Sequence, residues 1–245
     1  MTSRTPEDAD VWDPTACHGG THVSPPERTA FARLCQWGLV DAYRLHHREP
    51  GRFTWWDYRA GNFHKNFGMR IEISREDDLL LDTGGGLKRA SWFFLEGNSN
   101  EPFLLHNVDV ISSIDLGRML EAHDAGGALA TLAVQDRSTG RYLLFDEQAA
   151  LCGRRTGREG KPELVRTGAP APKALAFSGI HVISPRLLMM IEQDGAFSII
   201  DTYLRLAAKG ERIAAFRADE YYWRDLGKAD DLKLAAQDLN SGKVS

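Results

Sequence analysis

From residue 70 onward, short apolar runs alternate with helix-like segments, and this alternation constrains the fold more than any other feature of the sequence. The expected strands are residues 102–111, 129–134, 141–145 and 174–183, and the expected helices are residues 114–123, 199–208 and 228–239. Ser112 or Ser113 is a candidate N-terminal cap for the first of these helices, and Gly126-Gly127 is its stop signal. The alternation predicts an α/β fold with a largely parallel sheet that carries helices on both faces.

Residues 1–67 have a different character, because tryptophan and histidine are frequent there and aliphatic runs are few. A helix is expected near residues 26–37 and a turn at Pro50-Gly51. Such a short segment buries little apolar surface and is not expected to fold alone. The expected organisation is therefore a fragment over 1–67 that is not an independent domain, followed by part of an α/β domain over 68–245.

Composition excludes several classes of protein. The chain is 42% hydrophobic and 26% charged, which is typical of globular proteins rather than disordered or fibrous ones. Its net charge of -4 makes nucleic acid an unlikely partner. No run has the length and apolar character of a membrane span, and the polar N-terminus has no apolar signal segment, so no membrane association is expected.

The cysteines indicate the compartment. Cys17, Cys35 and Cys152 form no C-x-x-C pair, so neither a disulfide framework nor a structural zinc site is expected, and a reducing, cytoplasmic location is predicted. Cys17, His18 and His22 have a loose metal-like spacing, but a second ligand pair is missing, which argues against zinc.

Two aspartates occupy positions that suit ligand binding. Asp109 lies at the carboxyl end of the expected strand 103–111, where open α/β sheets place their ligand sites. Asp225 follows an extended segment and precedes a glycine and a helix. Each could simply cap a turn or a helix. Together they would form a hard-oxygen site for Mg²⁺, which takes one or two protein carboxylates and completes its shell with water and phosphates.

The run Leu-Leu-Asp-Thr-Gly-Gly-Gly-Leu-Lys-Arg-Ala at residues 80–90 places three glycines before a basic helical start. Such a turn lets backbone N–H groups approach a ligand closely. The run matches neither the Walker A spacing nor the G-x-G-x-x-G fingerprint. The acidic run Glu76-Asp77-Asp78 just before it is expected to be a solvated loop.

Four motifs in order give a more specific indication. They are Asp82-Thr83-Gly84-Gly85-Gly86, FLLHNVDV at residues 103–110, FSGIHVI at 177–183 and WRDLG at 223–227. In this order they resemble the motifs of sugar-1-phosphate nucleotidyltransferases, the NDP-sugar pyrophosphorylases, over residues 68–245. The resemblance implies a Rossmann-like nucleotidyltransferase sheet, here incomplete at its N-terminal side.

The resemblance also implies roles for individual residues. Asp109 and Asp225 would be the catalytic pair that holds Mg²⁺. The remaining nucleotide- or sugar-binding residues that it implies are Gly84, Gly85, Glu76, Asn107 and Gly179. The substrates would be an NTP and a sugar 1-phosphate, and the products an NDP-sugar and pyrophosphate.

One family element is missing from this sequence. The family begins with a strand and a glycine-rich loop close to L-A-A-G-x-G-x-R, followed by a Pro-Lys pair, and these surround the triphosphate. Nothing before Arg70 resembles that loop. Without its electrostatic donors, transition-state stabilisation is expected to fall by several kcal/mol, so impaired activity is predicted.

Residues 1–67 resemble another family, the exodeoxyribonuclease III and apurinic endonuclease enzymes, most clearly at FTWWDYRAG in residues 53–61. The metal-binding glutamate and the catalytic tyrosine of that family are absent. The alternative function is therefore DNA binding at most, through Trp55, Trp56 and Arg59. Both families contain sequences similar to residues 64–72, so the junction between the two parts is expected there. The chain is interpreted as two joined partial genes, and the alternative is a genuine fusion protein.

Overall fold

The computed structural model describes residue 29 and residues 72–76, 79–96, 100–166, 171–227 and 229–241. The chain divides into two compact units, Met1–Ile73 and Ser74–Ser245, and nearly all described residues belong to the second. The expectations for Cys17, for the fragment over 1–67 and for its DNA-contacting side chains Trp55, Trp56 and Arg59 lie outside the described residues.

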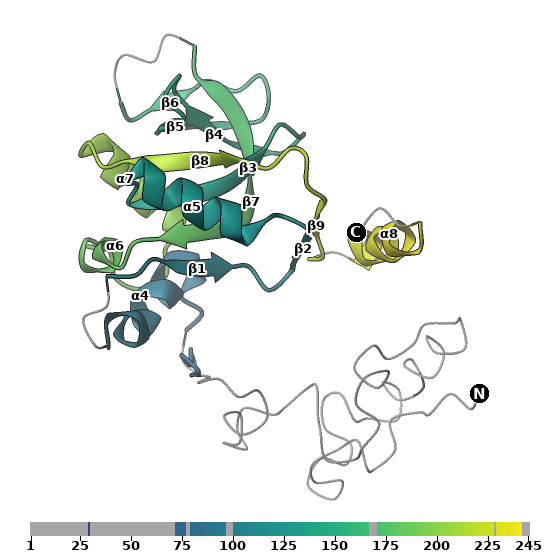
Figure 1. The fold of residues 1–245 in the computed structure, drawn as a ribbon, viewed down its shortest axis with the longest axis horizontal. Helices are drawn as coiled ribbons and strands as arrows, with labels where there is room; N and C mark the ends of the chain where they lie inside the picture. Colours follow the sequence, from purple (N-terminus) through teal and green to yellow (C-terminus); the bar gives the residue numbers. More distant parts are fainter. Residues whose placement is uncertain are drawn as a thin grey trace, which may run out of the picture. The chain divides into compact units, whose positions relative to one another are not determined.

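The second unit combines five described helices with nine strands (Figure 1). The helices are α4 (Asp82–Leu95), α5 (Leu116–Gly126), α6 (Arg186–Met189), α7 (Ile199–Ala208) and α8 (Ala229–Asn240). The strands are β1 (Phe103–His106), β2 (Val110–Ser112), β3 (Ala130–Gln135), β4 (Arg141–Phe145), β5 (Leu151–Thr156), β6 (Glu163–Leu164), β7 (Lys173–Ile183), β8 (Ile213–Arg217) and β9 (Trp223–Asp225). No helix in the described part of the chain is both long enough and apolar enough to cross a membrane.

Strand β7 is the centre of the main sheet. The strand order is β6-β5-β4-β7-β3-β8, and β1 also pairs with β7. The three neighbours of β7, which are β1, β3 and β4, all run antiparallel to it. Strand β8 pairs parallel with β3. The expectation of a largely parallel sheet is therefore wrong. Short connections join β4, β5 and β6, and a strand that follows a tight turn returns antiparallel to its predecessor.

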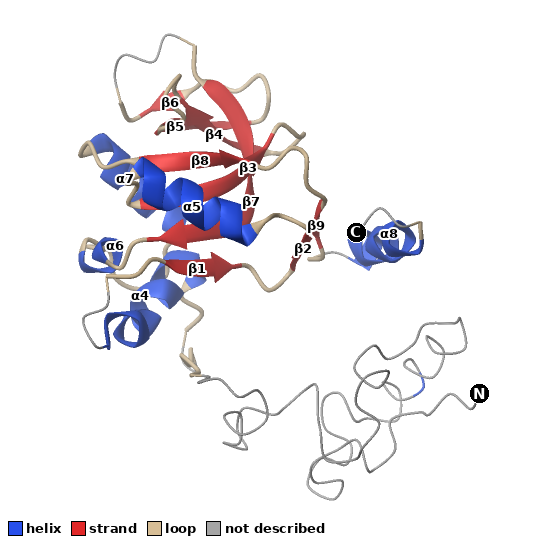
Figure 2. Ribbon diagram, in the orientation of Figure 1, coloured by secondary structure: helices blue, strands red, loops and turns tan. Residues whose placement is uncertain are grey.

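Helices cover both faces of this sheet, as expected (Figure 2). Side chains of β3 alternate between two cores. Leu132 and Val134 join the larger core, to which α4, α6 and α7 contribute, while Ala133 joins the smaller one with Met119 of α5. The prediction of an α/β fold with helices on both faces of the sheet is confirmed.

Local sequence signals fix the bounds of the covering helices. The Asp115 side chain accepts a hydrogen bond from the Arg118 N–H at the start of α5, and left-handed Gly127 ends that helix. The hydroxyl of Ser198 caps α7, which spans the residues expected from the sequence. The expected strand 102–111, by contrast, is divided into β1 and β2, and the three residues between them carry the candidate site.

Candidate functional site

Asp109 and Asp225 are brought together by the small sheet of β2 and β9. These strands pair antiparallel with Val110 opposite Asp225. The pairing continues past their ends, because the Leu226 N–H donates to the Asp109 carbonyl oxygen at 2.7 Å. Each aspartate therefore lies next to the end of the other's strand, and both are exposed.

Gly227 shows how close the two carboxylates are. A Cβ atom placed on Gly227 would lie 3.0 Å from Oδ1 of Asp225 and 3.6 Å from Oδ2 of Asp109. The two oxygens are therefore no farther apart than the sum of these distances, which is below the roughly 8 Å beyond which they could not share a cation and its water shell. Oδ1 of Asp225 also accepts the Gly227 N–H at 2.7 Å, which orients the carboxylate.

The donor set at this point consists of two carboxylates. Among the described residues, no group of three or more His, Cys, Asp or Glu side chains is arranged to hold a metal ion. Two hard oxygen ligands suit Mg²⁺, which keeps several waters and takes further oxygens from phosphates. They do not suit a structural zinc site, which needs four protein ligands.

Asn107, two residues before Asp109, contacts Gly179 of β7. The Asn107 N–H donates to the Gly179 carbonyl at 2.9 Å. Gly179 has a φ of +73°, and an added Cβ would lie 3.1 Å from Nδ2 of Asn107. Both the backbone conformation and the close approach therefore require glycine here.

A bulge in β7 accepts hydrogen bonds from the segments that precede Asp109 and Asp225. The register with β3 shifts between the pairs Leu132–His181 and Val134–Phe177, so residues 178–180 lie opposite Ala133 alone. Three successive carbonyls at the bulge accept one hydrogen bond each. The bonds run from Nη2 of Arg137 to Phe177, from Nε1 of Trp223 to Ser178, and from the N–H of Asn107 to Gly179.

Arg137 is a site residue that the sequence did not indicate. Its guanidinium carbon lies 3.6 Å from the centre of the Trp223 ring, two residues before Asp225. Burial lowers the pKa of the guanidinium from its ordinary value, while the negative charge of Asp225 raises it. A lone arginine after a strand carries no motif, and only the contact with Trp223 reveals its position.

Glu76, Gly84 and Gly85 lie in a separate cluster at the start of α4. The expected glycine turn is instead the first part of this helix, which begins at Asp82. The N–H groups of Gly84 and Gly85 both donate to the Phe197 carbonyl, at 2.9 and 3.3 Å. Oε2 of Glu76 accepts the Leu81 N–H at 2.7 Å. Their ligand-binding role stays a prediction.

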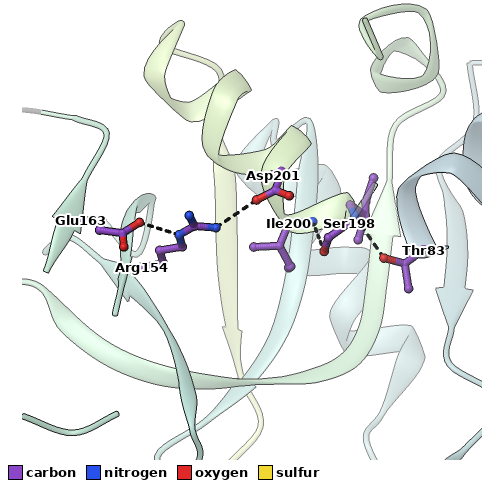
Figure 3. Close-up of polar contacts among 7 residues, drawn as sticks. Thr83, Arg154, Glu163, Ser198, Ile200 and Asp201 are labelled. Carbon is purple, nitrogen blue, oxygen red and sulfur yellow. Dashed lines mark hydrogen bonds and ion pairs between the residues drawn. The ribbon is translucent and has the colours of Figure 1, made fainter. Parts of the chain in front are cut away.

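The start of α4 also contacts the start of α7 (Figure 3). Oγ1 of Thr83 accepts the Ile199 N–H at 3.1 Å, while the Ser198 hydroxyl accepts the N–H of Ile200. In the same view Arg154 of β5 bridges Glu163 of β6 and Asp201 of α7, at 2.7 and 3.0 Å. These contacts fix two helix N-termini beside the sheet.

Comparison with known proteins assigns the family. Residues 60–242 match the family described as nucleotidyl transferase. The chain belongs to the nucleotidyl transferase family. It is 28% identical to mannose-1-phosphate guanylyltransferase 1 of Arabidopsis thaliana over 69% of this chain and 45% of that protein. It is 30% identical to N-acetylmuramate alpha-1-phosphate uridylyltransferase of Caulobacter vibrioides, over 71% of this chain and 67% of that protein.

The fold also resembles that of a solved structure. The crystal structure of HddC from Yersinia pseudotuberculosis complexed with GMP-PN superposes with a TM-score of 0.52 at 17% identity, over 74% of this chain and 73% of that one.

A second similarity is shorter. The chain is 38% identical to an exodeoxyribonuclease of Bacillus subtilis over 69 residues, which are 27% of each protein. It thus spans about a quarter of this relative and less than half of the Arabidopsis enzyme. The resemblance to two families is confirmed, with the nucleotidyl transferase part covering most of the chain.

Proposed function

We propose that this chain transfers a nucleotidyl group from an NTP to a sugar 1-phosphate, and that it does so slowly. The observation that carries the proposal is the convergence of Asp109 and Asp225 beside Gly227, within a family whose relatives are named for this reaction. A phosphate oxygen of the sugar 1-phosphate would attack the α-phosphorus. The bond from that phosphorus to the oxygen bridging to the β-phosphate would break, and pyrophosphate would leave.

Asp109 and Asp225 would hold Mg²⁺. The fit rests on the donor set, since two exposed carboxylate oxygens face the space that a side chain on residue 227 would fill. When bound, the cation would neutralise charge on the phosphate oxygens in the transition state. The chain's own part is to keep both carboxylates oriented, which the Gly227 N–H does for Asp225 and the β2–β9 pairing does for the backbone of Asp109.

The substrate would lie along the neighbouring residues. Asn107, two residues before Asp109, packs against Gly179, and both residues are proposed to contact the sugar phosphate. Gly84, Gly85 and Glu76 are proposed to face the nucleotide or sugar from the start of α4. Gly84 and Gly85 are buried, their N–H groups are bonded to the Phe197 carbonyl, and Phe197 and the Gly195 carbonyl fill the space beside their Cα atoms. A ligand would therefore reach the two glycines only after these contacts open.

Slow turnover follows from the missing phosphate-binding loop. Charge on an attacked triphosphate must be compensated by fixed donors, and each lost donor costs roughly a 100-fold decrease in rate. With neither the glycine-rich loop nor its Pro-Lys pair in the sequence, we expect turnover below the usual range of about 1 to 1000 per second.

The test combines metal binding with turnover. The full chain would be titrated with Mn²⁺ by electron paramagnetic resonance, and pyrophosphate release would be measured with a panel of NTPs and hexose 1-phosphates. Asp109→Asn and Asp225→Asn are expected to abolish Mn²⁺ binding and to lower any turnover about 100-fold or more. Asp124→Asn, an exposed carboxylate on α5, is the matched control. Mn²⁺ binding that survives in both site variants would contradict the proposal.

The second candidate is DNA binding by residues 1–67. It is favoured by the 69-residue similarity to an exodeoxyribonuclease and would involve Trp55, Trp56 and Arg59. Aromatic rings could stack on an unpaired base, and phosphate contacts would be strongest at low salt. A titration with abasic and intact duplexes at low salt decides it, because absence of binding there eliminates the idea.

A further inference from the structure

Arg137 lies against Trp223 of strand β9, which also carries Asp225. The loop after β3 carries its side chain across the face of Trp223, and Nη2 donates to the Phe177 carbonyl at 2.7 Å. Ring stacking and this hydrogen bond hold the plane of the guanidinium in one orientation. The side chain is half-buried, so its charge is screened less than that of an exposed arginine.

The donors of Arg137 are only partly used. Nη2 is bonded, and Nε is buried without a hydrogen-bond partner in the described part of the chain. Nη1 is not buried and forms no hydrogen bond to a described residue. An oriented guanidinium with an unused terminal nitrogen is suited to bind an anion such as a phosphate. The same phosphate could also contact a metal ion held by the neighbouring carboxylates.

We propose that Arg137 binds a phosphoryl oxygen of the substrate at the Asp109–Asp225 site, which rests on the function proposed above. The oxygen belongs either to the sugar 1-phosphate or to the pyrophosphate part of the nucleotide, and the chemistry is the same for both. Arg137 thereby supplies one fixed cation to a chain in which the basic phosphate-binding loop is absent from the sequence.

A purely structural role predicts the opposite response of the metal site. If Arg137 only held Trp223 and β9 in place, its loss would loosen Asp225 and weaken metal binding. If it binds phosphate, its loss removes a positive charge close to Asp225, and metal binding by the free protein stays equal or becomes tighter. Mn²⁺ affinity therefore separates the two roles.

The experiment uses the full chain and its Arg137→Gln, Arg137→Lys and Arg186→Gln variants. Arg186→Gln is the matched control. It removes an arginine of helix α6 that forms an ion pair with Glu211 and has no polar or ring contact with Trp223 or Phe177. Mn²⁺ affinity is measured by electron paramagnetic resonance, and affinity for glucose 1-phosphate and for pyrophosphate by calorimetry at saturating Mn²⁺. Thermal unfolding followed by circular dichroism checks the fold, and Arg137→Lys decides if Arg137→Gln does not fold.

Arg137→Gln is expected to bind at least one of the two phosphate ligands about 10- to 100-fold more weakly, as expected for a charged hydrogen bond, with Mn²⁺ affinity unchanged or higher. Arg137→Lys should be intermediate, because the charge remains and the planar fork is lost. The ligand that loses affinity identifies the source of the oxygen.

Two outcomes overturn the inference while the proposed function stands. One is unchanged affinity for both phosphate ligands, and the other is loss of Mn²⁺ binding in a folded Arg137→Gln variant. A wild-type chain that binds no Mn²⁺, or that still binds it in Asp109→Asn and Asp225→Asn, overturns the proposed function itself and the inference with it.

Discussion

At Gly179, backbone conformation and packing make the same demand on the residue. Its φ of +73° disfavours any side chain, and the space next to its Cα is filled by Asn107. Gly127 is the useful comparison, because its φ is +54° but no atom of a described residue lies within 4 Å of an added Cβ. The two glycines separate the cost of conformation from the cost of displacing a site residue.

Gly179→Ala is expected to lower the free energy of unfolding by about 2 kcal/mol, against about 1 kcal/mol for Gly127→Ala. Only Gly179→Ala should weaken Mn²⁺ binding, since Asn107 must move and Asp109 follows two residues later. Urea unfolding and Mn²⁺ titration measure both effects. Equal Mn²⁺ affinity in the two variants would show that Asn107 does not support the carboxylate.

His181 gives the fold an acid-sensitive point. Its Nδ1 lies 2.7 Å from the Tyr203 hydroxyl in the larger core. Burial, and then the charge of His106, lowers the pKa of His181 to about 3. In the unfolded chain the His181 imidazole has a pKa near 6.5. The stability that neutral His181 contributes is therefore complete above that pH and is lost as the pH falls toward 3.

Between about pH 7 and pH 5 the wild type should therefore lose about 2 kcal/mol more unfolding free energy than His181→Gln, which cannot be protonated. Urea midpoints of both chains at the two pH values test this, and carboxylates common to both cancel in the comparison. An identical acid dependence would assign the acid sensitivity to other groups.

At the scale of elements, α8 is tied to the strand that carries Asp225. Arg224 forms an ion pair with Asp238 of α8, and the Tyr222 hydroxyl donates to the same carboxylate at 3.1 Å. The Asp238 side chain is 9% exposed, whereas the ion pair of Arg154 with Glu163 is largely exposed. Burial makes the first pair the stronger link, because solvent screens the second.

Asp238→Asn is expected to lower the free energy of unfolding by about 2 kcal/mol, less than for a fully buried pair because Arg224 remains partly exposed. Mn²⁺ binding should weaken as well, because Arg224 directly precedes Asp225. Glu163→Gln is the control, with little expected change in either measurement. The idea that α8 supports the site fails if Asp238→Asn unfolds more easily but binds Mn²⁺ as tightly as the wild type.

At the scale of the whole molecule, β1 is an edge strand open to pairing with another chain. Among the described residues β1 pairs with β7 alone, and Leu104 is 41% exposed. A short apolar strand with an unpaired edge is a template for association with another chain.

Leu104→Lys should therefore reduce light scattering of the full chain at matched protein concentration and temperature, because a charged side chain on β1 opposes pairing. Leu120→Lys is the matched control, since Leu120 is 40% exposed but lies on α5. If both lysines reduce scattering equally, net charge and not the strand edge is responsible.

The sequence determined the local elements and the identity of the candidate residues. The N-terminal cap of α5 is Asp115 and not the expected Ser112 or Ser113. Helix α7 and strand β4 nevertheless have the bounds that the apolar pattern predicts, and α5 and β3 differ by one to a few residues. These signals act between near neighbours, so a sequence displays them directly. Asp109 and Asp225 were also identified from sequence, through motif order.

Tertiary structure decided the direction of β7, the division of the expected strand 102–111, and the place of Arg137. Each depends on contacts between segments far apart in the chain, such as β7 with its three antiparallel neighbours and Arg137 with Trp223. Periodicity gives the length of a strand but not its partner, because antiparallel and parallel neighbours bury the same alternating side chains. For that reason the sequence indicated the two candidate carboxylates, while only the folded chain placed the Arg137 guanidinium against Trp223, two residues before Asp225.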